Sequence, residues 1–149
     1  MNSKNKGDLS EARALYEFQK YNIPVLIPWG DNLRYDMVIE LQGEFKRVQV
    51  KTCNEERGDA IKCYCRSSTN HTTNKGYHLY TGQIDYFVFY NQTHNLIALV
   101  PIEDTENQKE ISLRISKPKN GQSKGIRYWS DYSFDKILCV ETLHEEPKS

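Results

Sequence analysis

The sequence has no long apolar run, and none of its hydrophobic stretches approaches the length of a membrane span. Lys4 and Lys6 near the N-terminus are not followed by the apolar segment that a secretory signal requires. Both absences argue against membrane insertion and export. We therefore expect a cytoplasmic protein with no membrane partner.

The sequence also lacks an excess of charge, because 20 basic residues balance 20 acidic ones. The total charge gives no sign of a nucleic-acid partner, but its distribution is uneven. One segment gathers cations around Glu110 as its only acid: Lys109, Arg114, Lys117, Lys119, Lys124 and Arg127. Such a segment is either a phosphate-binding surface or a solvated loop.

Cysteine is scarce, with four residues, and a zinc-binding spacing is missing. Cys63-x-Cys65 is followed by His71 and His78, whereas a zinc knuckle has two to four residues between its cysteines in a turn. A cytosolic compartment disfavours disulfides. Reduced thiols, buried or half-buried, are the favoured interpretation over a zinc site.

The length and composition are those of a compact domain. With 149 residues, 38% of them hydrophobic, the chain can form one core, and we expect a single domain over residues 1–149. Apolar residues at helical spacing predict an amphipathic helix over residues 10–21. Strands are predicted at residues 25–27, 60–66, 85–90, 96–100 and 111–115, with a weak terminal element at 134–140. A helix followed by strands is typical of a mixed α/β fold.

Residues 34–51 predict a tight hairpin. With a two-residue turn at Gln42-Gly43, Leu41 pairs with Glu44 and Asp36 falls opposite Gln49. Side chains alternate along a strand, so three polar residues, Asp36, Gln49 and Lys51, then share one face. The reverse face is apolar and suited to burial, with Met37, Ile39, Leu41, Val48 and Val50.

Two other registers of this hairpin have different consequences. A turn at Gly43-Glu44 pairs Asp36 with Lys51 and keeps the polar trio together, whereas a bulge separates it. An acid beside a Gln-x-Lys can bind a divalent cation and hold a water next to it. The face is also compatible with an ordinary solvated strand, since Arg34, Glu40 and Arg47 lie on it too.

Glu11, Tyr35-Asp36 and Gln49-Val50-Lys51 together resemble the active-site pattern of the PD-(D/E)XK nucleases. Within that superfamily the pattern Glu, Asp, Gln, Lys is most similar to the group I intron-encoded homing endonucleases of cyanobacterial type. The resemblance is strong over the first third of the chain and looser through residues 80–101 and 117–132. It implies a restriction-endonuclease-like core, with a mixed central sheet and an N-terminal helix.

The chain is also similar to the archaeal Holliday junction resolvases, through residues 7–11, 34–36 and 47–51. It departs from the superfamily name at two positions. Tyr35 replaces the proline before the aspartate, and Gln49 replaces the second carboxylate, which removes a negative charge but leaves an oxygen ligand. Glu11 can supply the missing charge, or it can belong to a capping box with Asp8 at a helix start.

The resemblance implies a magnesium- or manganese-dependent endonuclease that cuts double-stranded DNA at a long, pseudo-symmetric site during intron homing. Its metal ligands are Asp36, Gln49, the Val50 carbonyl and Glu11, while Lys51 orients and helps to deprotonate the attacking water. Cutting both strands implies a homo-oligomer, a dimer or a dimer of dimers. A junction resolvase and a noncatalytic DNA-binding module of the same fold are the alternatives.

A nuclease must also hold its substrate, and two segments have the chemistry for it. Residues 66–75 combine short polar side chains with flanking cations, as in a loop or ribbon that enters a groove, although a surface loop has the same composition. The second is the basic segment around residues 117–127. The DNA contacts predicted from both are Arg66, Ser68, Asn70, His71, Thr73, Asn74, Lys75, Lys117, Lys119, Gln122, Lys124 and Arg127.

Overall fold

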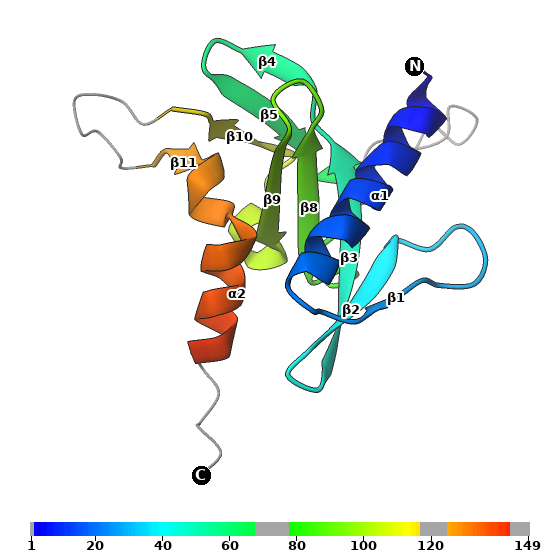
Figure 1. Ribbon diagram of the computed structural model, residues 1–149. Helices are drawn as coiled ribbons and strands as arrows, with labels where there is room; N and C mark the ends of the chain where they lie inside the picture. The colour runs from blue at the N-terminus through cyan, green and yellow to red at the C-terminus, as the bar shows by residue number, and fades with distance from the viewer. Residues whose placement is uncertain (1, 68–77, 117–124, 144–149) are drawn as a thin grey trace.

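The structure is a computed structural model and describes residues 2–67, 78–116 and 125–143 (Figure 1). At its centre lies a five-stranded sheet in the order β1-β2-β3-β8-β9. Strand β3 runs parallel to β8 and the other neighbouring pairs are antiparallel. The strands are β1 (Val25–Leu26), β2 (Met37–Leu41), β3 (Glu44–Thr52), β8 (Tyr86–Asn91) and β9 (Leu96–Pro101). The predicted mixed sheet is confirmed.

The β2–β3 hairpin has the first of the registers considered above. Leu41 pairs with Glu44 and Met37 with Val48, without a bulge between them. Gln42 and Gly43 both have positive φ, 53° and 80°, as the tight turn of a two-residue hairpin requires. The paired register ends at Met37, and the Asp36 N–H donates to the Val48 carbonyl instead of continuing it to Gln49. The alternative turn at Gly43-Glu44 is wrong.

Two helices cover one face of the central sheet: α1 (Ser3–Lys20) and α2 (Phe134–Leu143). Phe18 and Phe134 lie in one buried cluster with the apolar side chains of β2 and β3, and their ring centroids are 5.1 Å apart. The hairpin residues in this cluster are Met37, Ile39, Val48 and Val50, with Leu41 packed against them. The predicted burial of the apolar hairpin face is confirmed.

The predicted start of the first helix is wrong. Helix α1 begins at Ser3, where Asn2 caps it by accepting a hydrogen bond from the Asn5 amide at 2.8 Å. The proposed capping box fails because Asp8 lies inside the helix. The first turns are largely exposed, so they carry no apolar periodicity to reveal them in the sequence.

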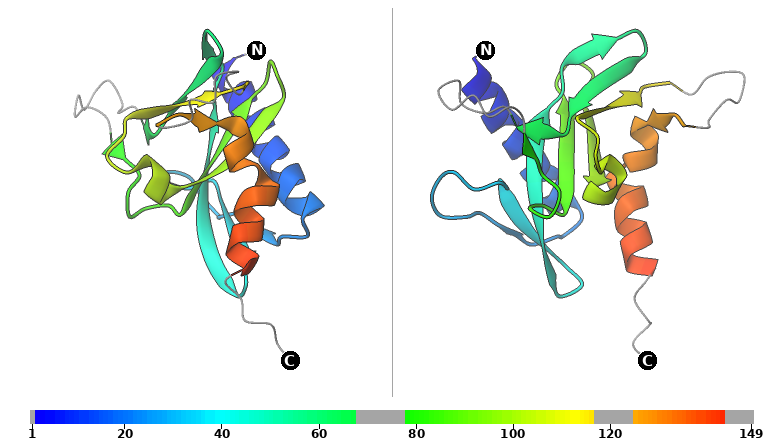
Figure 2. Two further views of the ribbon diagram at one scale, coloured as in Figure 1. Left: turned by 90° about the vertical axis from the view of Figure 1, so that its left-hand side faces the viewer. Right: turned by 180° about the vertical axis from the view of Figure 1, so that it is seen from behind.

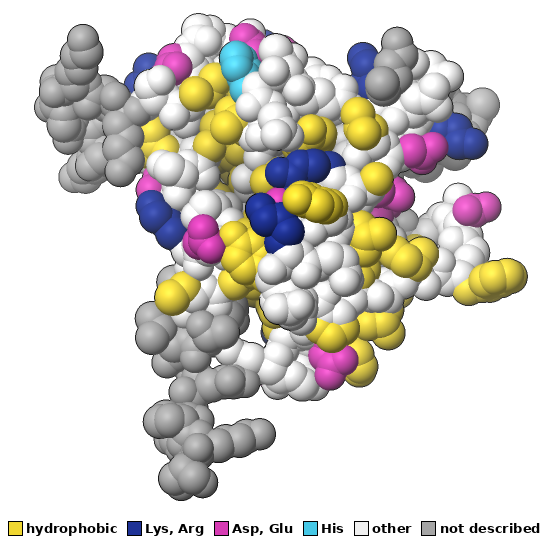
Figure 3. Space-filling view, in the orientation of Figure 1, with side chains coloured by type: hydrophobic (Ala, Val, Ile, Leu, Met, Phe, Trp, Pro, Cys, Tyr) yellow, Lys and Arg dark blue, Asp and Glu magenta, His cyan; other side chains and the backbone are white. Residues whose placement is uncertain are grey.

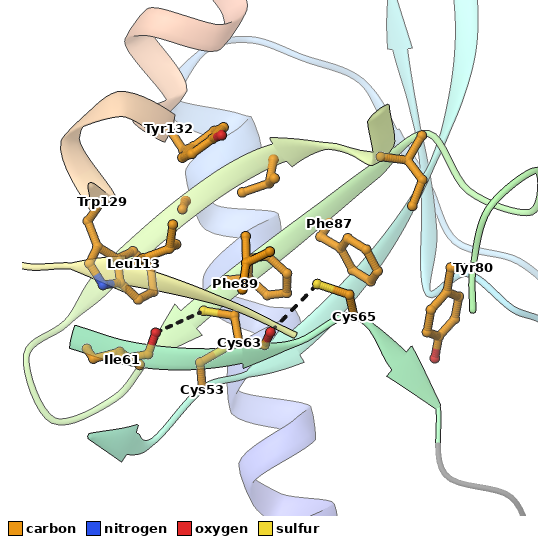
Figure 4. Close-up of a cluster of buried hydrophobic side chains, with 14 of the residues drawn as sticks. Cys53, Ile61, Cys63, Cys65, Tyr80, Phe87, Phe89, Leu113, Trp129 and Tyr132 are labelled. Carbon is orange, nitrogen blue, oxygen red and sulfur yellow. Dashed lines mark hydrogen bonds between the residues drawn. The ribbon is translucent and has the colours of Figure 1, made fainter. Parts of the chain in front are cut away.

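A four-stranded sheet, in the order β11-β10-β5-β4, covers the other face. Its strands are β4 (Glu55–Arg57), β5 (Ala60–Tyr64), β10 (Glu110–Arg114) and β11 (Arg127–Tyr128). Two short 3-10 helices flank it, η1 (Ile102–Thr105) and η2 (Trp129–Tyr132). Phe87 and Phe89 of β8 point toward this layer and stack with centroids 5.0 Å apart (Figure 4).

Three of the four cysteines belong to this second core. Cys53, Cys63 and Cys65 are buried free thiols, and Cys139 is an exposed one. The Cys63 thiol donates to the Ile61 carbonyl and the Cys65 thiol to the Cys63 carbonyl (Figure 4). Burial raises the pKa of Cys65 to about 12, so the thiol stays protonated at neutral pH. Of the histidines weighed as zinc ligands, His71 lies outside the described residues.

Strands β6 (Arg66–Ser67) and β7 (His78–Leu79) form a two-stranded ribbon. Figure 2 shows this ribbon on the side of the central sheet opposite α1. In the described parts of the chain, no helix combines the length and the apolar character needed to span a bilayer.

Candidate active site

Asp36 lies where β2 separates from β3. Its backbone N–H donates to the Val48 carbonyl at 2.8 Å, and its carboxylate accepts from the Val50 N–H at 2.9 Å. Because β2 leaves β3 at this point, its backbone no longer reaches the Val50 N–H. The Asp36 carboxylate accepts that hydrogen bond instead. This bond fixes the Asp36 side chain at the edge of the hairpin, between the two faces of the sheet.

Glu11 approaches Asp36 from α1. The two carboxyl groups line the same cleft and lie close enough for each to affect the pKa of the other. The preceding residue fixes this part of the helix, since the Ser10 hydroxyl lies 2.5 Å from the Thr52 hydroxyl of β3. Glu11 therefore meets Asp36 because a polar contact holds its helix turn against β3.

The pKa of each carboxyl group is raised in this position. Burial raises the pKa of Glu11 to about 7, and the adjacent Asp36 carboxyl adds to the rise. Burial also raises the pKa of Asp36, against the opposing effects of the Val50 N–H, the Glu11 hydrogen bond and the Lys51 charge. Close to neutral pH Glu11 can therefore retain its proton, which lowers the negative charge of the pair.

Lys51 is held on the other side of Asp36. Its ammonium group donates to the Arg66 carbonyl at 3.2 Å and lies 4.9 Å from the centre of the Tyr80 ring. Its charge also lowers the pKa of Asp36. Ribbon β6–β7 and Tyr80 thus position the lysine. No local pattern in the sequence indicates either partner of Lys51, because both come from segments distant from β3.

Gln49 lies beside the Val50 carbonyl, the peptide oxygen predicted as a ligand. The Gln49 amide nitrogen donates to that carbonyl at 3.4 Å. A carbonyl oxygen has two lone pairs, so this bond leaves one of them available.

A cleft of about 260 Å³ opens in front of the two carboxyl groups. Glu11 and Asp36 form one part of its lining, and the connection between β1 and β2 forms the rest. The latter residues are Ile27, Pro28, Gly30, Asp31, Asn32, Leu33 and Tyr35. The sequence of this connection indicates only a turn. Its contribution to the cleft depends on the way β1 pairs with β2 at the edge of the sheet.

The donor set suits a hard divalent cation. Two carboxyl groups, an amide and a peptide carbonyl offer oxygen ligands, the type that Mg²⁺ prefers. Among the described residues no cluster of three or more His, Cys, Asp or Glu gathers to hold a metal, so Glu11 and Asp36 would share the ion with the amide and the carbonyl. A cation would stabilise the ionised form of Glu11 against the burial and the adjacent Asp36 carboxyl that raise its pKa. The residues present therefore fit such an ion.

The predicted DNA contacts are less fully placed. Arg66 lies in β6, and its carbonyl is the acceptor of the Lys51 ammonium group. Arg127 lies in β11 and donates to the Asp104 carbonyl at 3.1 Å, on the opposite side of the molecule from β1 (Figure 1). The structure does not bring Arg127 to the carboxyl pair. The remaining contacts lie outside the described residues: Ser68, Asn70, His71, Thr73, Asn74, Lys75, Lys117, Lys119, Gln122 and Lys124.

Comparisons with known proteins agree with this geometry. The profile of the family described as PD-(D/E)XK endonuclease matches residues 1–135. A solved structure of a bacterial homing endonuclease, I-Ssp6803I, is similar with a TM-score of 0.76 and 24% sequence identity, over 99% of this chain and 100% of that chain. At this identity the similarity establishes the fold. A search of curated proteins finds no match.

Proposed function

The chain belongs to the PD-(D/E)XK endonuclease family and is therefore a DNA endonuclease, and we propose that it is a magnesium-dependent enzyme that cuts double-stranded DNA at a specific site, as a homing endonuclease. Manganese is the expected substitute ion. The observation on which this proposal rests is the pairing of the Glu11 and Asp36 carboxyl groups in one cleft, with the pKa of Glu11 raised to about 7. Such a pair is poised to exchange its proton for a cation.

Asp36, Gln49, the Val50 carbonyl and Glu11 would hold the ion, directly or through water. When bound, the ion would polarise the phosphodiester and lower the pKa of a nearby water. Asp36 is already fixed by the Val50 N–H, so the site would need little reorganisation there. Gln49 would have to turn its amide oxygen inward, away from its present bond to the Val50 carbonyl.

Lys51 would act on the water and on the phosphate. Its ammonium group has three N–H donors, and the Arg66 carbonyl takes one of them. The others would orient the attacking water, help to deprotonate it and stabilise the charge that develops on the pentacoordinate phosphorus. The half-buried position of Lys51 between Tyr80 and β6 favours this function, since it limits the motion of a long side chain.

Homing is the finer part of the proposal. It is supported by the similarity to a protein described as a bacterial homing endonuclease and by the pattern of Glu11, Asp36, Gln49 and Lys51. Such an enzyme would bind a long, pseudo-symmetric duplex as a homo-oligomer, a dimer or a dimer of dimers. A junction resolvase would instead select branched DNA by its shape.

The test is incubation with a randomised duplex library and with four-way junctions, in Mg²⁺, Mn²⁺, Ca²⁺ or EDTA, followed by mapping of the DNA ends. We expect breaks at one sequence in Mg²⁺ and Mn²⁺, and none with the Lys51→Ala variant prepared in parallel. Preferential cutting of junctions would favour a resolvase. Binding without cleavage in every cation would mean a noncatalytic module and would refute the proposed enzyme.

A further inference from the structure

The connection between β1 and β2, residues 27–33, presents large apolar side chains to solvent. Trp29 is 100% exposed and Ile27 is 65% exposed. Figure 1 shows this connection extending from the side of the molecule beyond the sheet edge. An indole left entirely in water is unusual in a protein without a partner, because it is one of the largest apolar surfaces a side chain can offer.

This exposed segment is also a wall of the candidate active site. Six of its residues line the cleft together with Glu11 and Asp36, among them Ile27, Pro28 and Leu33. A second protein chain seated on Trp29 would therefore lie against the entrance to the carboxyl pair. The position suits a contact with the substrate better than a contact with another subunit.

The charge of the segment indicates which part of a duplex it meets. Residues 27–33 include no Lys or Arg, and their one charged residue is Asp31. Figure 3 shows hydrophobic and acidic side chains, rather than basic ones, at the margin where this connection lies in Figure 1. Phosphates are bound by cations and N–H donors, so this segment is poorly suited to the DNA backbone. An indole is suited to the faces of bases, which are apolar and aromatic.

The two ends of the segment are anchored. Leu26 pairs with Val38 in the sheet, immediately before the segment. Immediately after it, Arg34 donates to the Ser67 hydroxyl at 2.6 Å and to the Leu79 carbonyl at 3.1 Å, and its guanidinium lies 3.8 Å from the centre of the Tyr80 ring. These bonds connect the segment to ribbon β6–β7. Its tip is thereby held in a fixed position beside the cleft.

We propose that Trp29 is a DNA-binding residue whose indole enters a groove and stacks on, or wedges between, bases next to the bond that is cut. This proposal rests on the proposed function, because it places the cut at the Glu11–Asp36 cleft. Apolar wedges that unstack a base step are a known means of bending DNA toward a protein surface. Here the wedge would present the neighbouring phosphate to the carboxyl pair.

The chain offers a direct spectroscopic test, since it has two tryptophans and Trp129 is 4% exposed inside the core. The probe is the duplex that the library experiment identifies, added in Ca²⁺ so that binding is measured without cleavage. We expect Trp emission to be quenched in the wild type and the quenching to be absent from Trp29→Phe. Trp29→Phe should bind nearly as well as the wild type, whereas Trp29→Ser should lose roughly 10- to 100-fold in affinity.

Phe45→Ser is the matched control, because Phe45 is also an exposed aromatic residue, at 63%, but lies in β3, outside the segment that lines the cleft. It should bind DNA as the wild type does. If the wild type binds and cuts DNA without quenching, and Trp29→Ser binds equally well, the Trp29 proposal is overturned while the proposed function stands. Dissociation of a DNA-free oligomer by Trp29→Ser, seen in sedimentation, would make Trp29 a subunit contact and overturn it as well. A wild type that binds no duplex would overturn both proposals.

Discussion

At the scale of single residues, the candidate site is dominated by two acids that occupy one small volume. Asp36 satisfies the Val50 N–H, and Glu11 is brought to it by the turn of α1 that Ser10 fixes against β3. Neither acid has a cation in direct contact among the hydrogen bonds described, although Lys51 lies close enough to affect Asp36. This shortage of positive charge makes the pair sensitive both to pH and to divalent ions.

The first prediction concerns the stability of Glu11→Gln. The pKa of Glu11 is raised from 4.5 to about 7, so the folded protein holds a proton that the unfolded chain releases in this interval. The wild type therefore loses stability as pH rises from about 4.5 to about 7, whereas a glutamine cannot ionise. In EDTA, the melting temperature of Glu11→Gln minus that of the wild type should be larger at pH 8 than at pH 5.

Mg²⁺ at pH 8 should reduce this difference in melting temperature, because it should stabilise the wild type more than Glu11→Gln. Glu106→Gln, an exposed position away from the cleft, is the matched control. An equal difference between variant and wild type at both pH values would contradict the assignment of a strained carboxyl to Glu11.

The second prediction separates binding from chemistry at Lys51. Lys51→Ala should reduce cleavage by about 100-fold or more, as for other groups that stabilise developing charge, while DNA binding without Mg²⁺ stays measurable. Lys46→Ala is the control, since Lys46 lies in the same strand but pairs with Glu44 at 2.9 Å. Asp36→Asn should also lose cleavage, through weaker metal binding. Loss of DNA binding together with cleavage in Lys51→Ala would argue for a structural role.

At the scale of elements, the β2–β3 hairpin determines which side chains meet. The positive φ values of Gln42 and Gly43 close the turn, and the turn sets the register that places Asp36 near Gln49. No atom lies within 4 Å of a Cβ added at Gly43, so the effect of a substitution there is purely a backbone effect. A substitution at Gly43 therefore tests the backbone conformation of the turn alone.

The third prediction compares one substitution at two sites. Gly43→Ala should destabilise the protein by about 1 kcal/mol, because alanine is strained at φ 80°. Gly7→Ala should stabilise it by about 1 kcal/mol, because Gly7 lies inside α1 and also has open space around it. Urea denaturation measures both. Effects of the same sign would contradict the assigned backbone conformations.

These elements differ in how far the sequence predicts them. The hairpin and the β8–β9 pair were predicted because turn chemistry and apolar alternation are local signals. The parallel pairing of β3 with β8 and the pairing of β10 with β5 join distant segments, and no local pattern encodes them. For the same reason the sequence indicated Asp36, Gln49 and Lys51, which share one hairpin, but not Tyr80 or the Arg66 carbonyl, which hold Lys51 in place.

At the scale of the whole molecule, the site lies where three parts meet. Helix α1 supplies Glu11, the hairpin supplies Asp36, Gln49 and Lys51, and ribbon β6–β7 supports the lysine. The described residues contain one such carboxyl pair, and a double-strand break requires two cuts. We therefore expect the active assembly to contain at least two chains, each cutting one strand.

The fourth prediction uses mixed assemblies to test whether each chain cuts one strand. Wild-type and Lys51→Ala subunits that carry different affinity tags can be purified together and given a supercoiled plasmid with the mapped target. One active subunit should cut one strand, so nicked circles should accumulate where the wild-type assembly yields linear DNA. A mixture of wild-type and Lys46→Ala subunits should linearise the plasmid normally. If the Lys51→Ala mixture linearises it at the wild-type rate, a single site must cut both strands, and the requirement for a homo-oligomer fails.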